Sequence, residues 1–376
     1  MLKKKLKHLE PHVHSTYSHL HSHPEVSWNE KETAAYILQR LSEDGLKCTP
    51  FPSFPGLIAE IGTGRPVIAI RADMDALWQE KDGSFQAVHS CGHDAHMSIV
   101  LGTAALLKDS IGGLKGTIRF IFQPAEETGE GAIAVTKLGV VDDVDYLFGL
   151  HLRPIEELPL GAAAPAINHG ASHHILGKII GEDAHGARPH LGTSAIETGM
   201  MLNQLLSQIK LSPMNPHSVK LTRFEAGGEN LNIIPGNAIF GIDARAQSNE
   251  DLNHLKVEIQ RSIQALEEWY GITIEQEHQP DTTASIISKE AANHMETAII
   301  DTLGRKGLHK TVVTPGSDDF HFYTKLRPNI KATMLALGAD LTPGLHHPHM
   351  TFDHSCLMIG VEIMSRAVME TMKAES

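Results

Sequence analysis

Cysteine is scarce in this chain, and its scarcity restricts what kind of protein this is. Only three cysteines occur in 376 residues, at positions 48, 91 and 356. Small secreted domains that depend on disulfides carry many closely spaced cysteines, so a disulfide framework is excluded as the basis of this fold. We therefore expect a reducing compartment, in which Cys91 is available for chemistry.

Long apolar runs are missing as well. The first fifteen residues begin with a basic segment, but no apolar stretch of roughly 7–15 residues follows it, as a secretory signal requires. No later segment reaches the roughly 18 uninterrupted apolar residues of a membrane span. We therefore predict a cytoplasmic protein that has no membrane partner.

Positive charge is in deficit. Lysine and arginine number 32 against 45 aspartates and glutamates, which gives a formal net charge of −13. Such a chain repels phosphate backbones, so a nucleic-acid partner is disfavoured.

The composition, 41% hydrophobic and 20% charged, is that of an ordinary globular protein. Its length exceeds the size at which one core usually stops growing, so we expect two folding units.

Two patterns alternate along the first 170 residues. Apolar runs with β-branched residues predict strands at 66–70, 117–122 and 146–152, and apolar residues at helical spacing predict helices at 31–45 and 96–110. Strands that alternate with helices indicate an α/β domain with a mostly parallel sheet. Ligands of such sheets gather at the carboxyl ends of the strands.

The pattern changes between about 171 and 280. Strands and helices are predicted there in the order βαββαβ, at 172–182, 193–210, 217–225, 237–246, 249–271 and 272–279. This order is that of a split ferredoxin-like unit. The α/β pattern then resumes with a helix, a strand and a closing helix, at 291–304, at 332–340 and from about 355. We therefore predict an α/β domain formed by 1–170 and 281–376, with an inserted α+β satellite domain, 171–280.

Residues 91–96 read C-G-H-D-A-H and combine a thiol with two imidazoles. These groups bind borderline divalent metals such as Zn²⁺, and Gly92 allows the loop to turn Cys91 and His93 toward one point. Taken alone, a polar loop that caps the helix beginning at His96 explains the stretch equally well.

Other ligand-type residues follow other predicted elements. Asp73 and Asp75 come after the first strand, and Glu126 and Glu127, in Q-P-A-E-E, come after the second. Adjacent carboxylates repel each other unless a cation holds one of them. Glu127 is therefore a candidate ligand and Glu126 a candidate base for a metal-activated water, whose pKa a metal lowers to roughly 7. A solvated loop pair is the alternative.

Histidines complete the set of candidate ligands. His151 ends the third strand, and the rigid loop P-G-L-H-H-P-H-M (343–350) offers three more. A buried core histidine and a surface turn are the respective alternatives. Together, four sequence-distant groups at the edges of one α/β unit favour a metal centre.

Nine short motifs are spread in order over nearly the whole chain. They are H-S-H-P-E (21–25), R-A-D-M-D-A-L (71–77), C-G-H-D-A-H (91–96), Q-P-A-E-E (123–127), G-L-H (149–151), A-H-G-A-R-P-H (184–190), N-I-I-P (232–235), G-S-D-D-F (316–320) and L-H-H-P (345–348). As a set they resemble the metal-dependent amidohydrolase family of hippurate hydrolase, N-acyl-amino-acid amidohydrolases and indoleacetyl-amino-acid hydrolases, in the zinc peptidase/aminoacylase superfamily. The predicted βαββαβ insertion is what the satellite domain of that family would look like.

The resemblance implies two divalent metal ions per chain, of Zn, Mn, Co or Ni. Cys91 would bridge them, with His93 and His151 on one ion and Glu127 and His346 on the other.

Three residues would then be catalytic. Glu126 would act as the general acid/base, Asp73 is a further candidate, and His185 would donate to the oxyanion in its own or a neighbouring active site. A plain turn residue is the alternative for His185. By resemblance, the exposed edge of the satellite sheet would form a homodimer contact.

Two satellite residues are candidates for binding the substrate. Burying the free α-carboxylate of an amino-acid conjugate requires fixed donors. Asn232 in a turn and Arg245 on the following strand supply such donors, and the resemblance favours this role for both. Ordinary turn and surface roles are the alternatives.

Three positions depart from the family pattern. His347 follows His346 where a small polar residue is usual, so the two histidines compete for the ligand role. Trp78 and Gln79 stand where many relatives have a proline, which alters the expected wall of the active site. Arg71 stands where a related branch has a ligating histidine, in agreement with a ligand role for Cys91.

These observations predict hydrolysis of the amide bond of N-acyl amino acids or small peptides by a metal-bridged hydroxide. N-acetyl-diaminopimelate deacetylation and small-peptide carboxypeptidase or dipeptidase activity are alternatives within this class. Outside it stand a Cys91 nucleophile with His93 or His96 as base, and a non-catalytic metal-binding module. Neither accounts for the paired glutamates.

Overall fold

The computed structural model describes residues 2–108, 115–278 and 280–375. These residues form two compact units. The first unit consists of Met1–Asn168, Ile286–Val313 and Asp318–Ser376, and the satellite unit of His169–Ser285 and Thr314–Ser317. None of the helices in the described ranges is long and apolar enough to cross a membrane. A cytoplasmic location stays a prediction.

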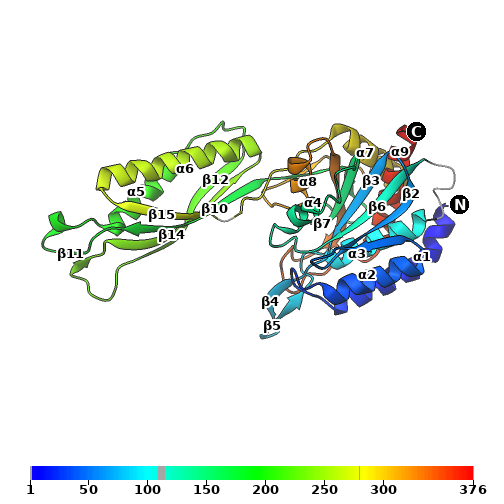
Figure 1. Cartoon of the computed structure of the whole chain (residues 1–376), viewed down its shortest axis with the longest axis horizontal. Coiled ribbons are helices and arrows are strands. Elements are labelled where there is room, and N and C mark those ends of the chain that lie inside the picture. The colour runs from blue at the N-terminus through cyan, green and yellow to red at the C-terminus, as the bar shows by residue number, and fades with distance from the viewer. Residues whose placement is uncertain (1, 109–114, 279, 376) are drawn as a thin grey trace. The chain divides into compact units, whose positions relative to one another are not determined.

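A seven-stranded mixed sheet forms the centre of the first unit (Figure 1). In spatial order its strands are β1 (Lys47–Pro50), β2 (Leu57–Thr63), β6 (Gly116–Gln123), β3 (Val67–Asp73), β7 (Tyr146–Pro154), β17 (Lys331–Leu341) and β8 (Ala163–Ala164). The four strands β6, β3, β7 and β17 run parallel, and the flanking strands pair antiparallel. The predicted α/β class is therefore confirmed.

Helices cover both faces of this sheet and produce two hydrophobic cores. One core includes residues of α1 (Leu2–Ser22), α2 (Lys31–Glu43), α3 (His93–Leu107), α7 (Lys289–Leu303) and α9 (Cys356–Ala374). The other includes residues of α4 (Gly131–Lys137) and α8 (His321–Leu326). Successive side chains of a strand point to opposite faces. Along β3, Ile68 and Ile70 therefore join the first core, while Val67 and Ala69 join the second.

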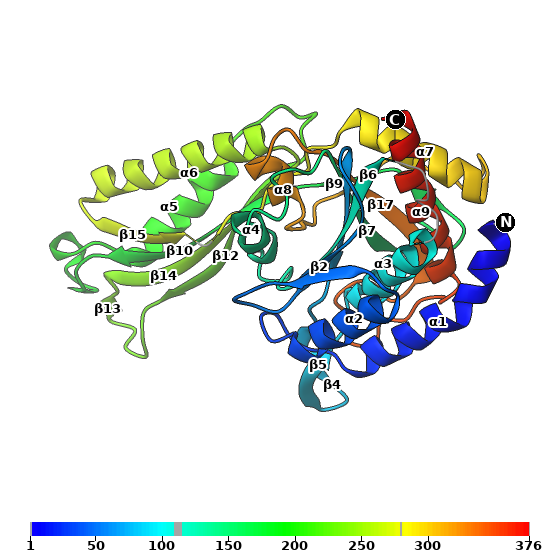
Figure 2. The same cartoon turned by 45° about the vertical axis from the view of Figure 1, so that its right-hand side comes forward.

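The satellite unit contains a second sheet with two helices (Figure 2). Its strands, in the antiparallel order β12-β14-β10-β15, are β12 (His217–Ala226), β14 (Asn237–Ala246), β10 (Ala171–Ile180) and β15 (Thr273–His278). Helices α5 (Ala195–Ser207) and α6 (Asn249–Tyr270) pack on the sheet, and Ser194 and Ser248 cap their N-termini. The predicted βαββαβ unit is confirmed.

Shorter elements complete the chain. Strand β11 (Ala184–His185) pairs with β13 (Ile233–Ile234), β9 (Ile167–His169) pairs with β16 (Val312–Thr314), and a short 3-10 helix spans Pro189–Leu191.

Several elements were not predicted, among them β1, β2, α1, α4 and α8. Helix α1 contains Pro11 and many polar residues, which hide its apolar face from sequence analysis. The hairpin of β4 (Leu77–Lys81) and β5 (Ser84–Val88), which follows β3 in the chain, was not predicted either. The predicted helix 96–110 begins three residues earlier, at His93. Its last two positions, 109 and 110, and position 279 of the predicted strand 272–279 lie outside the described residues.

Candidate metal centre

The candidate ligands gather at the carboxyl ends of three parallel strands. Strand β3 ends at Asp73, β6 ends one residue before the turn 124–127, and β7 carries His151 near its end. Helix α3 begins beside them at His93, after Gly92 with a left-handed φ of 88°. The topology therefore brings together groups that are distant in sequence.

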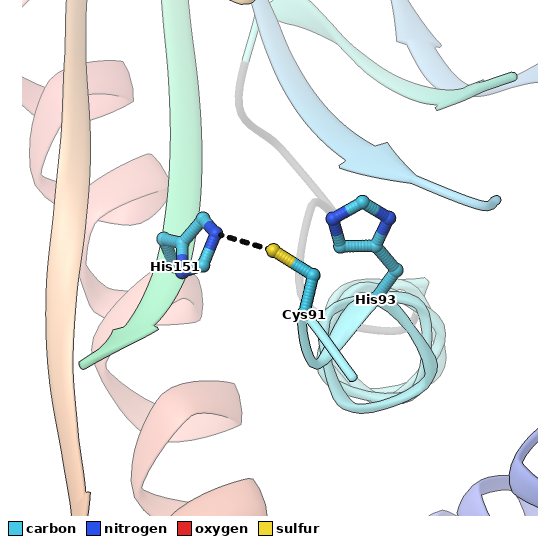
Figure 3. Close-up of side chains that lie close together, drawn as sticks. All are labelled: Cys91, His93 and His151. Carbon is cyan, nitrogen blue, oxygen red and sulfur yellow. Dashed lines mark hydrogen bonds between the residues drawn. The ribbon is translucent and has the colours of Figure 1, made fainter. Parts of the chain in front are cut away.

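Three buried side chains, Cys91, His93 and His151, form the first group of possible ligands. One ligand atom of each lies within 4.8 Å of the others. Figure 3 shows the Cys91 sulfur between the two imidazole rings, and its Sγ lies 3.5 Å from His151 Nε2.

The hydrogen bonds of the two histidines leave one nitrogen of each ring available. His151 Nδ1 donates to the Leu152 carbonyl at 2.7 Å, and His93 Nδ1 donates to the Asp75 carbonyl at 2.8 Å. Carbonyl groups commonly fix metal-binding imidazoles in this way. The buried His93 Nε2 has no hydrogen-bond partner among the described residues. Both Nε2 atoms are therefore suited to bind a metal.

His96 lies next to these rings but is fully engaged. Its Nδ1 donates to Asp73 at 2.8 Å, and its Nε2 accepts from the Leu152 backbone N–H at 3.0 Å. With both nitrogens occupied, His96 supports the site rather than binding a metal.

The second group shares Cys91 and adds Glu127 and His346. His346 Nε2 lies 3.4 Å from Glu127 Oε1, an oxygen that has no hydrogen-bond partner among the described residues. His346 has a left-handed φ of 64°; its N–H donates to the Ser90 carbonyl at 2.7 Å, and its own carbonyl accepts from Gln79 Nε2 at 2.8 Å.

The competing histidine, His347, is engaged elsewhere. Its Nδ1 accepts from the His349 backbone N–H at 3.1 Å. Of the two neighbours, His346 is the one that the structure places beside Glu127.

Trp78, expected in the active-site wall, has 63% of its surface exposed on the β4–β5 hairpin.

Glu126 lies beside both groups. Its Oε2 is 3.9 Å from His93 Nε2, and its side chain is 11% exposed. Burial raises the pKa of Glu126 well above the usual range for a glutamate, and the nearby carboxylates of Asp318 and Glu127 raise it further. Glu126 is therefore suited to accept a proton and to hold it.

The same environment bears on Cys91. Burial raises the pKa of its thiol well above the usual range, and burial lowers the pKa of His151 well below that of a free histidine. The raised pKa of the thiol argues against Cys91 as a nucleophile. His93, a candidate base in that alternative, differs from His151: although burial alone would lower it, the pKa of His93 is held well above its usual range by Asp73, Cys91 and Asp75.

Asp73 and Arg71 belong to a buried network behind the ligands. Arg71 donates to Asp73 at 2.5 Å, to Asp319 at 2.6 Å and to Gln123 Oε1 at 2.9 Å. Although burial alone would raise it, the pKa of Asp73 is held well below its usual range by His93, His96 and Arg71. Asp73 thus remains ionised and orients His96.

Asp75 was noted in the sequence as a ligand-type residue after the first strand, but no role was predicted for it. Its carboxylate accepts the backbone N–H groups of Glu126 and Glu127, at 3.1 and 3.0 Å. Glu30, which no local signal identifies, accepts the N–H of Ala125 at 2.8 Å.

The three remaining candidates lie in the satellite unit. Gly186 N donates to the Asn232 carbonyl at 2.8 Å, which brings the loop of His185 beside Asn232. Arg245 Nε donates to Asp243 at 3.0 Å, and its side chain is 41% exposed. Their roles toward a substrate stay predictions.

The donor set fits divalent ions of the zinc type. A thiol, imidazoles and a carboxylate are the groups that such ions take, and two of the ligand atoms, on His93 and Glu127, are buried without a hydrogen-bond partner in the described part of the chain. A bound cation would satisfy both atoms.

Comparisons with known proteins identify the family of this chain. The family model described as Peptidase family M20/M25/M40 matches residues 69–370. N-acetylcysteine deacetylase of Bacillus subtilis (strain 168) is 32% identical over 94% of this chain and 96% of its own length. The IAA-amino acid hydrolase ILR1-like 4 of Arabidopsis thaliana is 31% identical over 82% of this chain and 73% of its own.

A solved structure is also similar. The Bacillus subtilis YxeP protein, described as a dinuclear metal binding peptidase from the M20 family, is 28% identical with a TM-score of 0.83, over 98% of this chain and 99% of that one. The resemblance seen in the sequence motifs is therefore confirmed: the chain belongs to Peptidase family M20/M25/M40, and it is an enzyme that hydrolyses amide bonds.

Proposed function

We propose that this enzyme hydrolyses the amide bond of N-acyl amino acids, with acetyl, aromatic acyl or similar acyl groups, and that it uses two divalent metal ions. The observation that carries the proposal is the pair of ligand groups, Cys91–His93–His151 and Cys91–Glu127–His346, which share only Cys91. If each group held one ion, Cys91 would contribute to both, and the other ligands of the two ions would be different residues. Zn, Mn, Co and Ni are the candidate metals.

Divalent ions held by these five residues would polarise the amide carbonyl and acidify water. Glu126 performs the proton transfers: its carboxylate takes a proton from the attacking water and delivers it to the nitrogen of the departing amine. Its raised pKa suits the second step, because burial and the neighbouring carboxylates favour the protonated form that delivers the proton. Asp73 and Asp75 act indirectly, by holding His96 and the glutamate turn.

The substrate class is supported by the similar proteins. Their names specify an N-acetyl amino acid in one case and amino-acid conjugates of IAA in another. Both substrates are amides formed by the amino group of an amino acid. N-acetyl-diaminopimelate and small peptides share this bond and stay alternatives.

The test is removal and return of the metals. We expect full-length protein stripped by a chelator to lose turnover of every substrate in a panel of N-acetyl, benzoyl and indoleacetyl amino acids, N-acetyl-diaminopimelate and dipeptides. Adding Zn²⁺, Mn²⁺, Co²⁺ or Ni²⁺ singly should restore it. Turnover that survives complete demetallation would refute the proposal.

For the satellite unit we propose two roles. Asn232 and Arg245 bind the α-carboxylate of the substrate, since an arginine fork matches a carboxylate and Asp243 restrains the Arg245 side chain. The unpaired outer edge of β12 forms a homodimer by strand pairing, and His185 donates to the oxyanion of its own or the partner's substrate. Sedimentation velocity at micromolar concentration tests the dimer, and a strict monomer would exclude a role for His185 in trans.

A further inference from the structure

The turn that carries both glutamates has an unfavourable backbone conformation. Ala125, directly before Glu126, has a left-handed φ of 55°. A residue with a Cβ atom rarely adopts this conformation, because the side chain approaches the backbone too closely. The turn therefore needs support from its surroundings.

Two carboxylates from distant parts of the chain provide this support. Glu30 Oε1 accepts the N–H of Ala125 at 2.8 Å, Asp75 Oδ1 accepts that of Glu126 at 3.1 Å, and Asp75 Oδ2 accepts that of Glu127 at 3.0 Å. Three consecutive backbone donors are thus held by two side chains, both of them fully buried.

Glu30 in particular is not explained by the rest of the fold. Glu30 is 0% exposed, and its second oxygen has no hydrogen-bond partner in the described part of the chain. Burial raises the pKa of Glu30 to about 7, so retaining a carboxylate here is unfavourable for the fold alone. Asp75 is better satisfied, because Ser27 Oγ also donates to it at 2.6 Å and His93 Nδ1 lies 3.3 Å from its Oδ1.

We propose that Glu30 and Asp75 are positioning residues that clamp the turn 125–127 and thereby set the directions of Glu126 and Glu127. This inference rests on the proposed roles of those two glutamates. A relaxed turn would move Glu127 away from Cys91 and His346, so the clamp should control metal affinity as well as turnover.

A matched pair of substitutions tests the clamp. Glu30→Gln keeps an oxygen that accepts the Ala125 N–H, whereas Glu30→Met has a similar volume and no acceptor. Glu25→Ala is the control for helix α2: it removes the bonds from Thr33 N and Thr33 Oγ, at 2.7 and 2.8 Å, and leaves the turn untouched. Each full-length variant is demetallated and titrated with Zn²⁺ by calorimetry at pH 8, and its kcat is measured after reloading.

We expect Glu30→Gln and Glu25→Ala to bind Zn²⁺ within about threefold of the unmodified protein. Glu30→Met should bind at least about tenfold more weakly and lose kcat by a similar factor, the range typical of residues that orient metal ligands. Adding Ala125→Gly to Glu30→Met should recover at least about threefold of the affinity, because glycine adopts a left-handed φ without strain.

Three results would overturn the clamp: equal Zn²⁺ affinity in Glu30→Met and Glu30→Gln, an equal loss in Glu25→Ala, or no recovery with Ala125→Gly. If Glu30→Met does not fold, Asp75→Asn replaces it, since the amide leaves one of the N–H groups without an acceptor. Unchanged Zn²⁺ affinity in that variant would equally refute the clamp.

The clamp and the proposed function fail in different ways. If the unmodified protein keeps its turnover without metal, the proposed function is wrong whatever the variants show. If turnover depends on metal but Glu30→Met behaves like Glu30→Gln, only the clamp is wrong.

Discussion

Replacing Arg71 by methionine should destabilise the first unit strongly. The Arg71 guanidinium is 1% exposed and forms ion pairs with Asp73, Asp318 and Asp319, at 2.5, 3.3 and 2.6 Å. Methionine fills part of the same volume but leaves these buried carboxylates without their cation. Breaking a buried ion pair by removing one partner costs roughly 3–5 kcal/mol.

Arg327→Met is the matched control. Arg327 also pairs with an aspartate, Asp142 at 2.7 Å, but the two side chains are 39% and 56% exposed. Ion pairs in that environment contribute roughly 0–1 kcal/mol. The two variants therefore share a substitution and differ in burial.

Urea unfolding followed by tryptophan fluorescence measures the difference. The chain has three tryptophans, and the exposed Trp269 lies in the satellite unit, so a Trp269→Phe background reports on the first unit through Trp28 and Trp78. We expect Arg71→Met to lower the free energy of unfolding of that unit by several kcal/mol more than Arg327→Met. Equal losses would show that the buried ion pairs of Arg71 stabilise this unit no more than the exposed pair of Arg327 does.

Three further predictions concern single residues. Because burial raises the pKa of Glu30 from 4.5 to about 7, ionisation of Glu30 destabilises the native state as the pH rises through this range. The free energy of unfolding of Glu30→Gln, relative to that of the unmodified protein, should therefore increase by roughly 2–3 kcal/mol between pH 5 and pH 8. Urea unfolding measures this difference, and a value that does not change with pH would contradict the prediction. Cys91→Ala removes the ligand common to both groups, so the metal content measured by mass spectrometry should fall from two ions per chain to fewer than one, and retention of both would refute the bridging role. Replacing the free α-carboxylate of an N-acyl amino acid substrate by a methyl ester should lower kcat/KM at least about tenfold, or about 1.4 kcal/mol. Arg245→Ala should lose most of its activity on the free acid and little on the ester, and equal losses would show that Arg245 has a structural role.

Much of the fold was predictable because local patterns determine it. The buried strand β3 and the amphipathic helix α6 follow directly from periodicity, and the order βαββαβ identified the satellite unit. Helix α1 was missed although Leu6, Val13, Tyr17 and Leu20 are buried at helical spacing, since Pro11 and the surrounding polar residues mask this stripe.

The sequence motifs named the candidate ligands, whose role stays a prediction, but they did not reveal the hydrogen bonds that support the turn of the two glutamates. Metal ligands are of a few residue types, such as Cys, His and Glu, and a sequence reveals where these types follow predicted strands. The contact between Glu30 and Ala125 joins residues 95 positions apart through a backbone group, and no side-chain pattern records it. The sequence left His346 and His347 as alternatives for a similar reason, because no local pattern records that His346 Nε2 lies 3.4 Å from Glu127 Oε1.

The most direct test of the central claim is the turnover of Glu126→Gln on an N-acyl amino acid that the unmodified enzyme hydrolyses. Glutamine has the same shape and cannot exchange a proton, so metal content should stay at two ions per chain. The account predicts that kcat falls by on the order of 10²–10⁴-fold at full metal loading, the contribution expected of a general acid/base. Unchanged turnover with both metals bound would show that Glu126 does not carry the proton and would contradict the mechanism.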